Sequence, residues 1–392
     1  MNTDALIIDT LRTPTGRGRP GGALAGIHPV DLLAQALTAL VERTGIDPGT
    51  VDDVLIGCVS QTGEQSATPG RMAWLAAGYP EHVPATTIDR KCGSSQQAVH
   101  FAAQGILAGA YDIVIAGGVE SMSRVPMGSA RAGADPYGAG VAARFAPGLV
   151  SQGVAAELVA AKYGVSREAQ DDYAARSHRL AIESAVAFER EIAPVTTADG
   201  TIVTADETPR PGTNTERLAG LKPAFETPQL SGRFPQIGWS VTAGNSSQLA
   251  DSATLVLLMS ERKARELGIT PRARVHAMTA VGDDPVLMLT APIPATEKIL
   301  SRSGLTLDEM DHIEINEAFA PVPLAWQSHF NADFDKVNPR GGAIALGHPL
   351  GASGTRLMTT MLHALEDNQQ RYGLQLMCEA GGMANATIIE RL

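Results

Sequence analysis

Cysteine is scarce in this chain of 392 residues, and its three cysteines lie far apart, at positions 58, 92 and 378. An odd number of scattered cysteines argues against a disulfide framework. Without a Cys-x-x-Cys pair, the sequence also argues against a structural zinc site, so no bound metal is expected. The cysteines that are present direct attention to thiol chemistry instead.

Positive charge and long apolar runs are also lacking. The net charge of −11 disfavours nucleic acid as a partner. No apolar run approaches the roughly 18 residues of a membrane span. The N-terminal stretch MNTDALIIDTLRTP has no basic region followed by an apolar segment of signal-peptide length. We therefore expect a globular, cytoplasmic protein that has no membrane partner.

Nucleotide-binding motifs are missing or broken. GRGRPG at residues 16–21 fits the glycine spacing of a dinucleotide-binding loop, but Pro20 interrupts it and the next predicted helix begins only near Pro29. No acidic residue follows at the expected distance, and no Gly-Lys-Ser/Thr motif is present. We interpret GRGRPG as a turn.

Two series of alternating strands and helices are predicted, one before residue 121 and one after residue 290, which indicates an α/β protein with largely parallel sheets. Cys92 comes 35 residues after the strand end Gly57, and His348 comes 32 residues after the strand end Asn316. Paired glycines follow the next helix in both series. This correspondence indicates an internal duplication, in which equivalent strand ends meet at one central cleft.

The region between the two series, residues 121–242, is rich in Gly, Pro and Ala and contains one clear predicted helical region, residues 153–190. A long insertion of this kind often carries ligand-binding residues. We therefore expect it to bind a ligand.

The stretch DRKCGSSQQAVHFAAQGILA at residues 89–108 places Cys92 where a helix is predicted to begin, with Ser94 or Ser95 as the N-cap. Unpaired N–H groups and the helix dipole favour negative charge there, so we expect a lowered thiol pKa and a nucleophilic cysteine. From this stretch alone, a buried structural cysteine is an equal alternative.

A second chemical centre is predicted in the loop NPRGGAIALGHPLGASG, where five glycines in residues 341–354 surround His348. Cys378 ends a predicted strand just before Ala380, a placement expected to expose its side chain, whereas Cys58 is expected in the core. A cysteine and a histidine suffice for acyl transfer through a thioester, and a second cysteine adds an acid/base group.

Six motifs along the chain resemble those of a known family. The matching motifs, in chain order, are DRKCGSSQQA, GGVESMS, TAGNSSQLAD, NEAFAP, GGAIALGHPLGASG and CEAGGMANATIIERL. They are similar to the motifs of the thiolases, the acetyl-CoA acetyltransferase or 3-ketoacyl-CoA thiolase family, over essentially the whole chain.

The resemblance implies a thiolase fold of class α/β, with two similar βαβαβαββ halves in a five-layer αβαβα core and an inserted loop domain. The N-terminal half would be residues 1–120, completed by 243–271. The loop domain would be residues 121–242, used for coenzyme A (CoA) binding and oligomerisation, and the C-terminal half residues 272–392. The resemblance further implies a homodimer or homotetramer, CoA and acyl-CoA as substrates, and no permanently bound cofactor.

Site residues follow from the matching motifs. Cys92 would be the acylated nucleophile and His348 its activating base and an oxyanion donor. Cys378 would be the acid/base at the α-carbon and at the CoA sulfur. Asn316 would hold a water that completes one oxyanion hole with His348, and the backbone N–H groups of Cys92 and Ala380 would form the other.

The same resemblance places further residues around the substrate. Glu317 would orient the site, and Ser247 would face the pantetheine arm of CoA. Lys222 would meet the nucleotide phosphates, with Arg217 nearby, and Met288 would lie beside the acyl pocket.

Two departures bear on the substrate. Many acetoacetyl-CoA thiolases have Cys-Ile-Gly-Gly-Gly where this chain has Cys378-Glu379-Ala380-Gly381-Gly382, and glycines after Asp-Pro where it has Met288-Leu289-Thr290-Ala291. Both departures resemble degradative members, including those of actinobacterial steroid breakdown.

The resemblance therefore implies thiolytic cleavage of 3-ketoacyl-CoA to acetyl-CoA or propionyl-CoA and a shortened acyl-CoA, through an acyl group on Cys92. The reaction would be reversible as a Claisen condensation. Three alternatives are a short-chain biosynthetic acetoacetyl-CoA thiolase, a related ketoacyl synthase, and a non-catalytic CoA-binding protein of the same fold.

Overall fold

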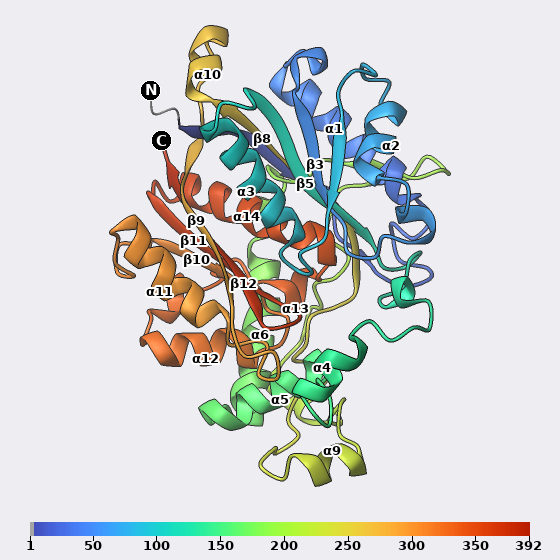
Figure 1. Cartoon of the computed structure of the whole chain (residues 1–392), viewed down its shortest axis with the longest axis vertical. Helices are drawn as coiled ribbons and strands as arrows, with labels where there is room; N and C mark the ends of the chain where they lie inside the picture. Colours follow the sequence, from blue (N-terminus) through green and yellow to red (C-terminus); the bar gives the residue numbers. More distant parts are fainter. Residues whose placement is uncertain (1–3) are drawn as a thin grey trace.

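The structure is a computed structural model that describes residues 4–392 (Figure 1). The first three residues of the N-terminal stretch lie outside the described residues. Two units of strands and helices form the body of the molecule, and an inserted region projects from this body to one end (Figure 1).

The two units have the same order of elements. The first comprises β1 (Ala5–Arg12), α1 (Pro29–Thr44), β3 (Asp53–Gly57), α2 (Pro69–Ala76), β4 (Ala85–Ile88), α3 (Ser94–Leu107), β5 (Ile113–Ser121) and β8 (Ala250–Ser260). The second comprises β9 (Ala273–Gly282), α11 (Pro292–Ser303), β10 (His312–Ile315), α12 (Pro321–Phe330), α14 (Ser353–Asp367), β11 (Tyr372–Glu379) and β12 (Met383–Arg391). A parallel bridge from Ile313 to Val337 takes the place that the β3–β4 pairing has in the first unit. The predicted duplication is therefore present.

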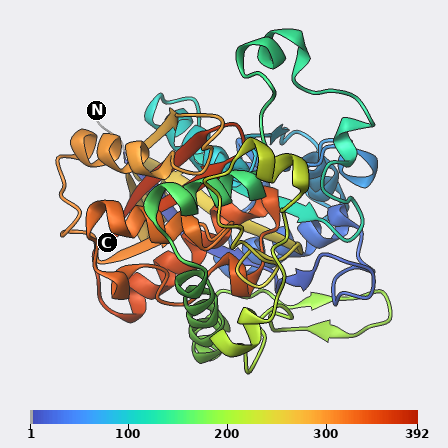
Figure 2. The same ribbon diagram turned by 90° about the horizontal axis from the view of Figure 1, so that it is seen from below.

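The inserted region and its borders contain shorter elements. These are α4 (Gly138–Arg144), α5 (Gln152–Tyr163), α6 (Arg167–Glu183), α7 (Ala185–Phe188), β6 (Val195–Thr196), β7 (Ile202–Val203), α8 (Thr215–Ala219) and α9 (Pro228–Arg233). Elsewhere the chain adds β2 (Gly16–Arg17), α10 (Glu261–Leu267) and α13 (Ala343–Leu346). Seen from below, the segment that contains α4 extends away from the body of the molecule (Figure 2).

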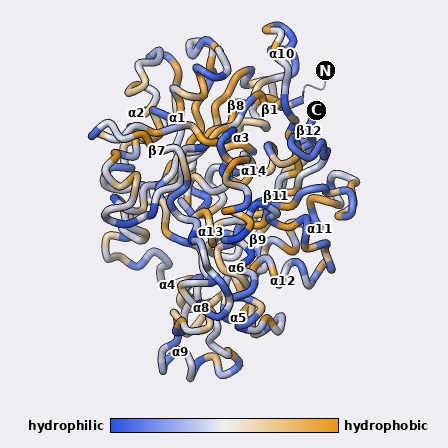
Figure 3. Tube along the Cα trace, turned by 180° about the vertical axis from the view of Figure 1, so that it is seen from behind, coloured by the Kyte–Doolittle hydropathy of each residue, from blue (hydrophilic) through white to orange (hydrophobic). Residues whose placement is uncertain are grey.

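The sheets of the two units join edge to edge. The strand order is β10-β11-β12-β9-β1-β8-β5-β3-β4, with β2 pairing β8, and β1 meets β9 through only two residue pairs, Leu6 with Arg274 and Ile7 with Ala273. The prediction of largely parallel sheets is wrong: in residues 4–392 only the strand pairs β3–β4, β3–β5 and β10–β11 are parallel, because the central strands β12, β9, β1 and β8 all pair antiparallel with their neighbours. The strands are the most hydrophobic parts of the chain trace (Figure 3). Since both faces of each unit's sheet are covered by helices, apolar side chains are required on both faces.

Helices form five layers with these sheets. α1 and α2 pack on the outer face of the first unit, and α11 packs on the outer face of the second. Between the two sheets, α3 and α14 pack against each other and contact strands of both units. The N-terminal ends of these two central helices therefore meet in the middle of the molecule.

Glycines permit this close approach. A Cβ added at Gly118 would lie 2.0 Å from the carbonyl oxygen of Gly351, and one added at Gly354 would lie 2.4 Å from the backbone nitrogen of Gln96. Both distances are far shorter than van der Waals contact. The glycine-rich loop before α14 can therefore lie directly on the end of β5 and on the start of α3.

α12 begins only at Pro321, because the irregular residues before it bond to a neighbouring loop: Ser247 N–H donates to the Ala318 carbonyl and Ala320 N–H to the Asn245 carbonyl, both at 2.9 Å. The helical region predicted at residues 153–190 is three helices, because Gly164 ends α5 with a left-handed backbone (φ 66°) and α6 gives way to α7 at Ser184.

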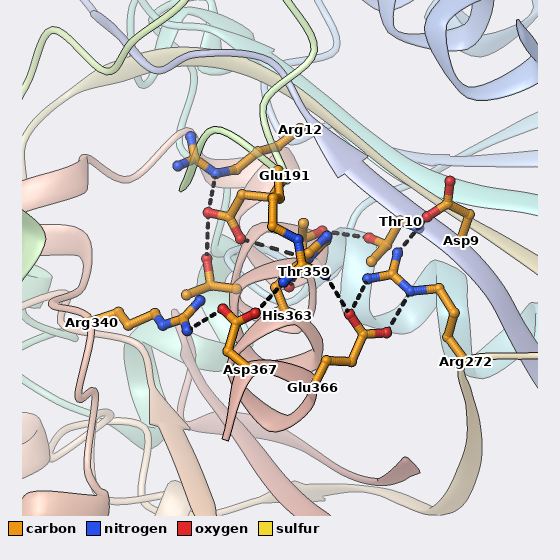
Figure 4. A network of polar contacts seen from close by, with 12 residues as sticks. Asp9, Thr10, Arg12, Glu191, Arg272, Arg340, Thr359, His363, Glu366 and Asp367 are labelled. Atoms are coloured by element: carbon orange, nitrogen blue, oxygen red, sulfur yellow. Dashed lines mark hydrogen bonds and ion pairs between the residues drawn. The ribbon is translucent and has the colours of Figure 1, made fainter. Parts of the chain in front are cut away.

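A buried network of charges links the inserted region to both units (Figure 4). The Arg12 guanidinium of β1 donates to Glu191 at 2.8 Å and to Asp206 at 2.7 Å, both from the inserted region. On α14, the Thr360 hydroxyl donates to Glu191 at 3.1 Å.

Among the described residues, no helix is both long enough and apolar enough to cross a membrane.

Candidate active site

Cys92 occupies a tight turn between β4 and α3. Lys91, just before it, has a left-handed backbone (φ 50°), and Gly93 N–H donates to the Arg90 carbonyl at 3.1 Å. Gly93 is the N-cap, so the prediction that Ser94 or Ser95 caps the helix is wrong. The Ser94 hydroxyl instead donates to the Lys91 carbonyl at 2.5 Å, which holds the turn that presents Cys92.

The Cys92 thiol is buried, and burial raises its pKa; the neighbouring Cys378 and Glu379 raise it further. The prediction of a lowered pKa at the helix N-terminus is therefore wrong for this state of the site. The Gln152 side chain at the start of α5 lowers the pKa, but its effect is smaller than that of burial and the two neighbours. Cys92 is a neutral thiol that needs a base before it can attack.

His348 lies in the loop between α13 and α14 and is also buried. The Ser353 hydroxyl donates its one hydrogen to the Pro349 carbonyl at 2.9 Å, so at 2.6 Å from His348 Nδ1 it must accept a hydrogen bond. Nδ1 therefore carries the imidazole proton and Nε2 is the basic nitrogen. Burial, assisted by Arg356, lowers the pKa of His348 to about 3, which keeps the ring neutral.

Asn316 and Cys378 complete this group. Asn316 Nδ2 lies 3.4 Å from His348 Nε2, and Cys378 Sγ lies 3.9 Å from the Asn316 carbonyl oxygen. Cys378 is the penultimate residue of β11, close to the predicted strand end, but its side chain is buried rather than exposed. Burial, with a contribution from Glu379, raises its pKa to about 12.

Apolar packing brings Cys92 to the same place. It lies in a small buried cluster with Leu350, which follows His348 by two residues, and with Met377, which precedes Cys378. The structure therefore gathers Cys92, His348 and Cys378 at the start of the two central helices. Cys58 lies in the core, where burial raises its pKa.

Glu317 supports the loop that carries His348. Its carboxylate accepts hydrogen bonds from Tyr173 (2.8 Å), Ser177 (2.6 Å), Asn338 (3.0 Å) and the Ile344 N–H (3.1 Å). These donors come from α6, from the loop before Arg340 and from α13. One buried carboxylate thus holds three segments around Asn316 in register.

Two residues with structural roles at the site were not singled out from the sequence. Glu120, on β5, accepts from the N–H groups of Val59, Ser60 and Gly351 at 2.9 to 3.0 Å. The carbonyl of Gln248 accepts from His348 N–H at 2.8 Å. Both residues lie inside matching motifs, GGVESMS and TAGNSSQLAD, and that position is the only sequence signal for them.

Ala380 and Met288 lie on adjoining turns. Ala380 begins the turn between β11 and β12, and the turn's Gly382 carbonyl accepts from Asp283 N–H at 2.6 Å. Met288 lies in the segment that follows Asp283 and has a left-handed backbone (φ 54°). Its side chain packs in the buried cluster that contains Cys378. Leu289 and Ala291 are buried as well.

Three of the expected CoA residues lie on two adjoining segments. Gly244 touches Leu218 and Leu221, so the loop of Ser247 lies against the segment that carries Arg217 and Lys222. Arg217 and Lys222 are exposed, and Arg217 Nη1 donates to the Gly212 carbonyl at 2.9 Å.

The chain is built from two duplicated α/β units, and its candidate site brings together two thiols and one imidazole, a set of groups that suffices for acyl transfer. The family model described as thiolase, N-terminal domain, matches residues 5–262, and that described as thiolase, C-terminal domain, matches residues 269–391. The chain belongs to the thiolase family.

Individual proteins agree with this placement. The chain is 49% identical to the steroid 3-ketoacyl-CoA thiolase FadA6 of Mycobacterium tuberculosis, over 100% of this chain and 95% of that protein. It is 43% identical to the 3-ketoacyl-CoA thiolase of Pseudoalteromonas translucida, over 99% of this chain and 98% of that protein. The crystal structure of the Bacillus anthracis acetyl-CoA acetyltransferase is 36% identical, with a TM-score of 0.88 and full coverage of both chains. The predicted family, fold class, thiolase function and acyltransferase class are confirmed.

Proposed function

We propose that this thiolase cleaves 3-ketoacyl-CoA with CoA, releasing acetyl-CoA or propionyl-CoA and a shortened acyl-CoA through an acyl-enzyme on Cys92. The observation that carries the proposal is the gathering of two neutral thiols and one neutral imidazole at the start of the central helices. Run backwards, the same steps are a Claisen condensation.

In the first half of the reaction, His348 Nε2 takes the proton of Cys92, and the thiolate attacks the 3-keto carbonyl of the substrate. The bond between carbons 2 and 3 then breaks, its electron pair forms the acetyl-CoA enolate, and Cys378 protonates the α-carbon. In the second half, Cys378 takes the proton of a new CoA thiol, and that sulfur attacks the thioester on Cys92. His348 returns the proton to Cys92 as it leaves.

Two sets of donors would stabilise the negative oxygens. Once His348 Nε2 is protonated, it donates to the enolate oxygen together with a water held by Asn316. The carboxamide oxygen Oδ1 of Asn316 is buried and has no hydrogen-bond partner in residues 4–392, which suits a bound water. The backbone N–H groups of Cys92 and Ala380 serve the tetrahedral intermediate, each such donor being worth a few kcal/mol.

CoA would lie along these adjoining segments. Ser247 faces the pantetheine arm, Lys222 and Arg217 meet the phosphates, and Met288 borders the acyl group. This assigns the phosphate end of CoA to a loop domain of residues 121–242. Ser247 belongs to an N-terminal half of 1–120 completed by 243–271, and Met288 belongs to a C-terminal half of 272–392. CoA enters as a substrate, and we expect a homodimer or homotetramer in the cytoplasm.

Peptide mass mapping after brief mixing with an acyl-CoA tests the nucleophile. We expect the acyl group on Cys92, with ping-pong kinetics, and a Cys58→Ala variant should carry the same adduct. An adduct on Cys378 or Cys58 while Cys92 stays free would contradict the assignment.

We further propose that the substrate is a medium-chain or ring-bearing 3-ketoacyl-CoA. The support is the replacement of glycines by Leu289, Thr290 and Ala291, together with the similarity to a protein named as a steroid thiolase. A matched chain should exceed acetoacetyl-CoA in kcat/KM by about tenfold or more. If acetoacetyl-CoA is cleaved as efficiently as every larger substrate, the chain is a short-chain acetoacetyl-CoA thiolase instead.

A further inference from the structure

Glu379 is a buried carboxyl group that the proposed reaction does not use. It is the last residue of β11 and directly follows Cys378. Its side chain is fully buried, and neither carboxyl oxygen has a hydrogen-bond partner among residues 4–392. Burying an ionised carboxylate without a partner costs free energy, so the neutral form is favoured there. A buried carboxyl group without hydrogen-bond partners also needs an explanation.

The Glu379 carboxyl lies directly on the residue that follows Cys92. A Cβ added at Gly93 would lie 1.9 Å from Glu379 Oε1 and 2.8 Å from its carboxyl carbon. The carboxyl therefore occupies the space beside the Gly93 backbone, one residue from Cys92, while its own backbone is one residue from Cys378. Among residues 4–392, Glu379 is the carboxyl group whose charge influences the pKa of both Cys92 and Cys378.

The charge of Glu379 reaches both thiols. After burial, the ionised carboxylate is the main influence that raises the pKa of Cys378, and it also raises the pKa of Cys92. The carboxyl is itself difficult to ionise: burial raises its pKa to about 8, although Arg90 and the backbone N–H of Asn385 lower it, and Asp89 adds a small increase. These residues come from the turn before α3 and from β12.

We propose that Glu379 is a positioning residue for the two thiols, a buried carboxyl whose ionisation opposes thiolate formation at Cys92 and Cys378 and so ends activity on the alkaline side. The inference rests on the proposed function, because it assumes that both thiols must become thiolates during the reaction. At neutral pH the protonated carboxyl adds no charge, and a thiolate can form. When the carboxyl ionises at higher pH, a thiolate would have to form beside a second buried negative charge.

Glu379→Gln tests the charge without changing the shape. Above pH about 8, kcat/KM of the wild-type enzyme should fall, whereas that of E379Q should stay level for about one further pH unit. Alkylation of Cys92 by iodoacetamide, followed by peptide mapping, should show an apparent thiol pKa about one unit lower in E379Q, because only the thiolate reacts.

Glu390→Gln is the matched control. Glu390 stands opposite Tyr372 at the far end of the same β11–β12 hairpin, roughly 20 Å along the strands. The E390Q variant also loses one carboxylate charge, but the pH dependence of kcat/KM and the pH dependence of Cys92 alkylation should both stay as in the wild-type enzyme. If E379Q has the wild-type pH profile and the wild-type alkylation pKa, Glu379 is a packing residue and the inference is wrong.

Two further measurements keep the inference testable. If E379Q does not fold, infrared spectroscopy of the wild-type enzyme takes its place. The band of a protonated carboxylic acid should be present at pH 7 and disappear near pH 8, and its absence at pH 7 would overturn the inference. Glu379→Ile, which also removes the charge, should lose both this band and the alkaline fall. Failure of the proposed function is distinguishable, because it would appear as a wild-type enzyme with no acyl group on Cys92.

Discussion

The protonation states of the proposed catalytic residues are set mainly by burial. Cys92 and Cys378 are protonated and His348 is unprotonated, because each would have to hold a charge away from water. In the proposed reaction, the proton transfer from Cys92 to His348 would therefore accompany substrate binding, when new hydrogen bonds can stabilise the charges. A helix N-terminus alone does not create a thiolate here.

Cys378→Ala should separate the two halves of the reaction. Without an acid at the α-carbon and a base for the CoA thiol, turnover should fall by roughly 10²- to 10⁴-fold. Cys92 should still accept an acyl group from acyl-CoA, although more slowly, because His348 can still activate Cys92 and only the proton that Cys378 gives to the departing CoA sulfur is lost. Steady-state assay and mass mapping of the same preparation measure both quantities.

Cys58→Ala provides the comparison for that experiment. Cys58 is equally buried but lies in the core, so its loss should change stability more than turnover. Near-normal turnover of Cys378→Ala would mean that the second cysteine is only structural.

At the scale of elements, the site depends on how closely α3 and α14 approach. Cys92 and His348 precede equivalent helices of the two units. The site is therefore formed where the duplicated units face each other, and neither unit contains it alone.

Gly354→Ala should push these helices apart. The new methyl group would lie 2.4 Å from the backbone nitrogen of Gln96, which cannot move without shifting α3. We expect a loss of roughly 1 to 3 kcal/mol in the free energy of unfolding, together with a lower rate of Cys92 acylation. Urea unfolding and a single-turnover assay measure these effects.

Gly26→Ala is the control, because a Cβ there meets nothing within 4 Å and the residue is exposed. If Gly354→Ala is as stable and as active as Gly26→Ala, the close approach of the helices does not matter to the site.

At the scale of the whole molecule, buried ion pairs and hydrogen bonds connect the inserted region to the two units. Arg12 pairs with Glu191 and Asp206, and Glu191 also accepts from Thr360. Nearby, Arg272 at the start of β9 pairs with Glu366 of α14 at 2.7 Å (Figure 4).

Arg12→Met should destabilise the whole protein. It leaves the fully buried Glu191 without its guanidinium partner, and an uncompensated buried charge costs about 3 to 5 kcal/mol in the free energy of unfolding. Urea denaturation measures the loss. Arg179→Met breaks an exposed pair with Glu183 and should have little effect; equal effects of the two variants would contradict this role for Arg12.

Much of the fold was predictable because the patterns that specify it are local. The predicted strand ends at Gly57 and Asn316 lie at or next to the ends of β3 and β10, the stretch after Cys92 located α3, and the paired glycines revealed the duplication. Cys92, His348 and Cys378 could be selected because each stands at an unusual junction of strand or helix with a glycine-rich turn.

Only the tertiary structure decided how those residues behave. The irregular backbone between β10 and Pro321 depends on bonds to Asn245 and Ser247, more than 60 residues away in the chain. Likewise, the neutral state of Cys92 and its proximity to Glu379 come from burial between the two units. The sequence by itself determined which chemical groups the chain has and the turns that present them. Folding decided which groups are buried away from water, which are charged and which lie next to each other. The reason is that desolvation and electrostatic energy depend on distance in space rather than along the chain.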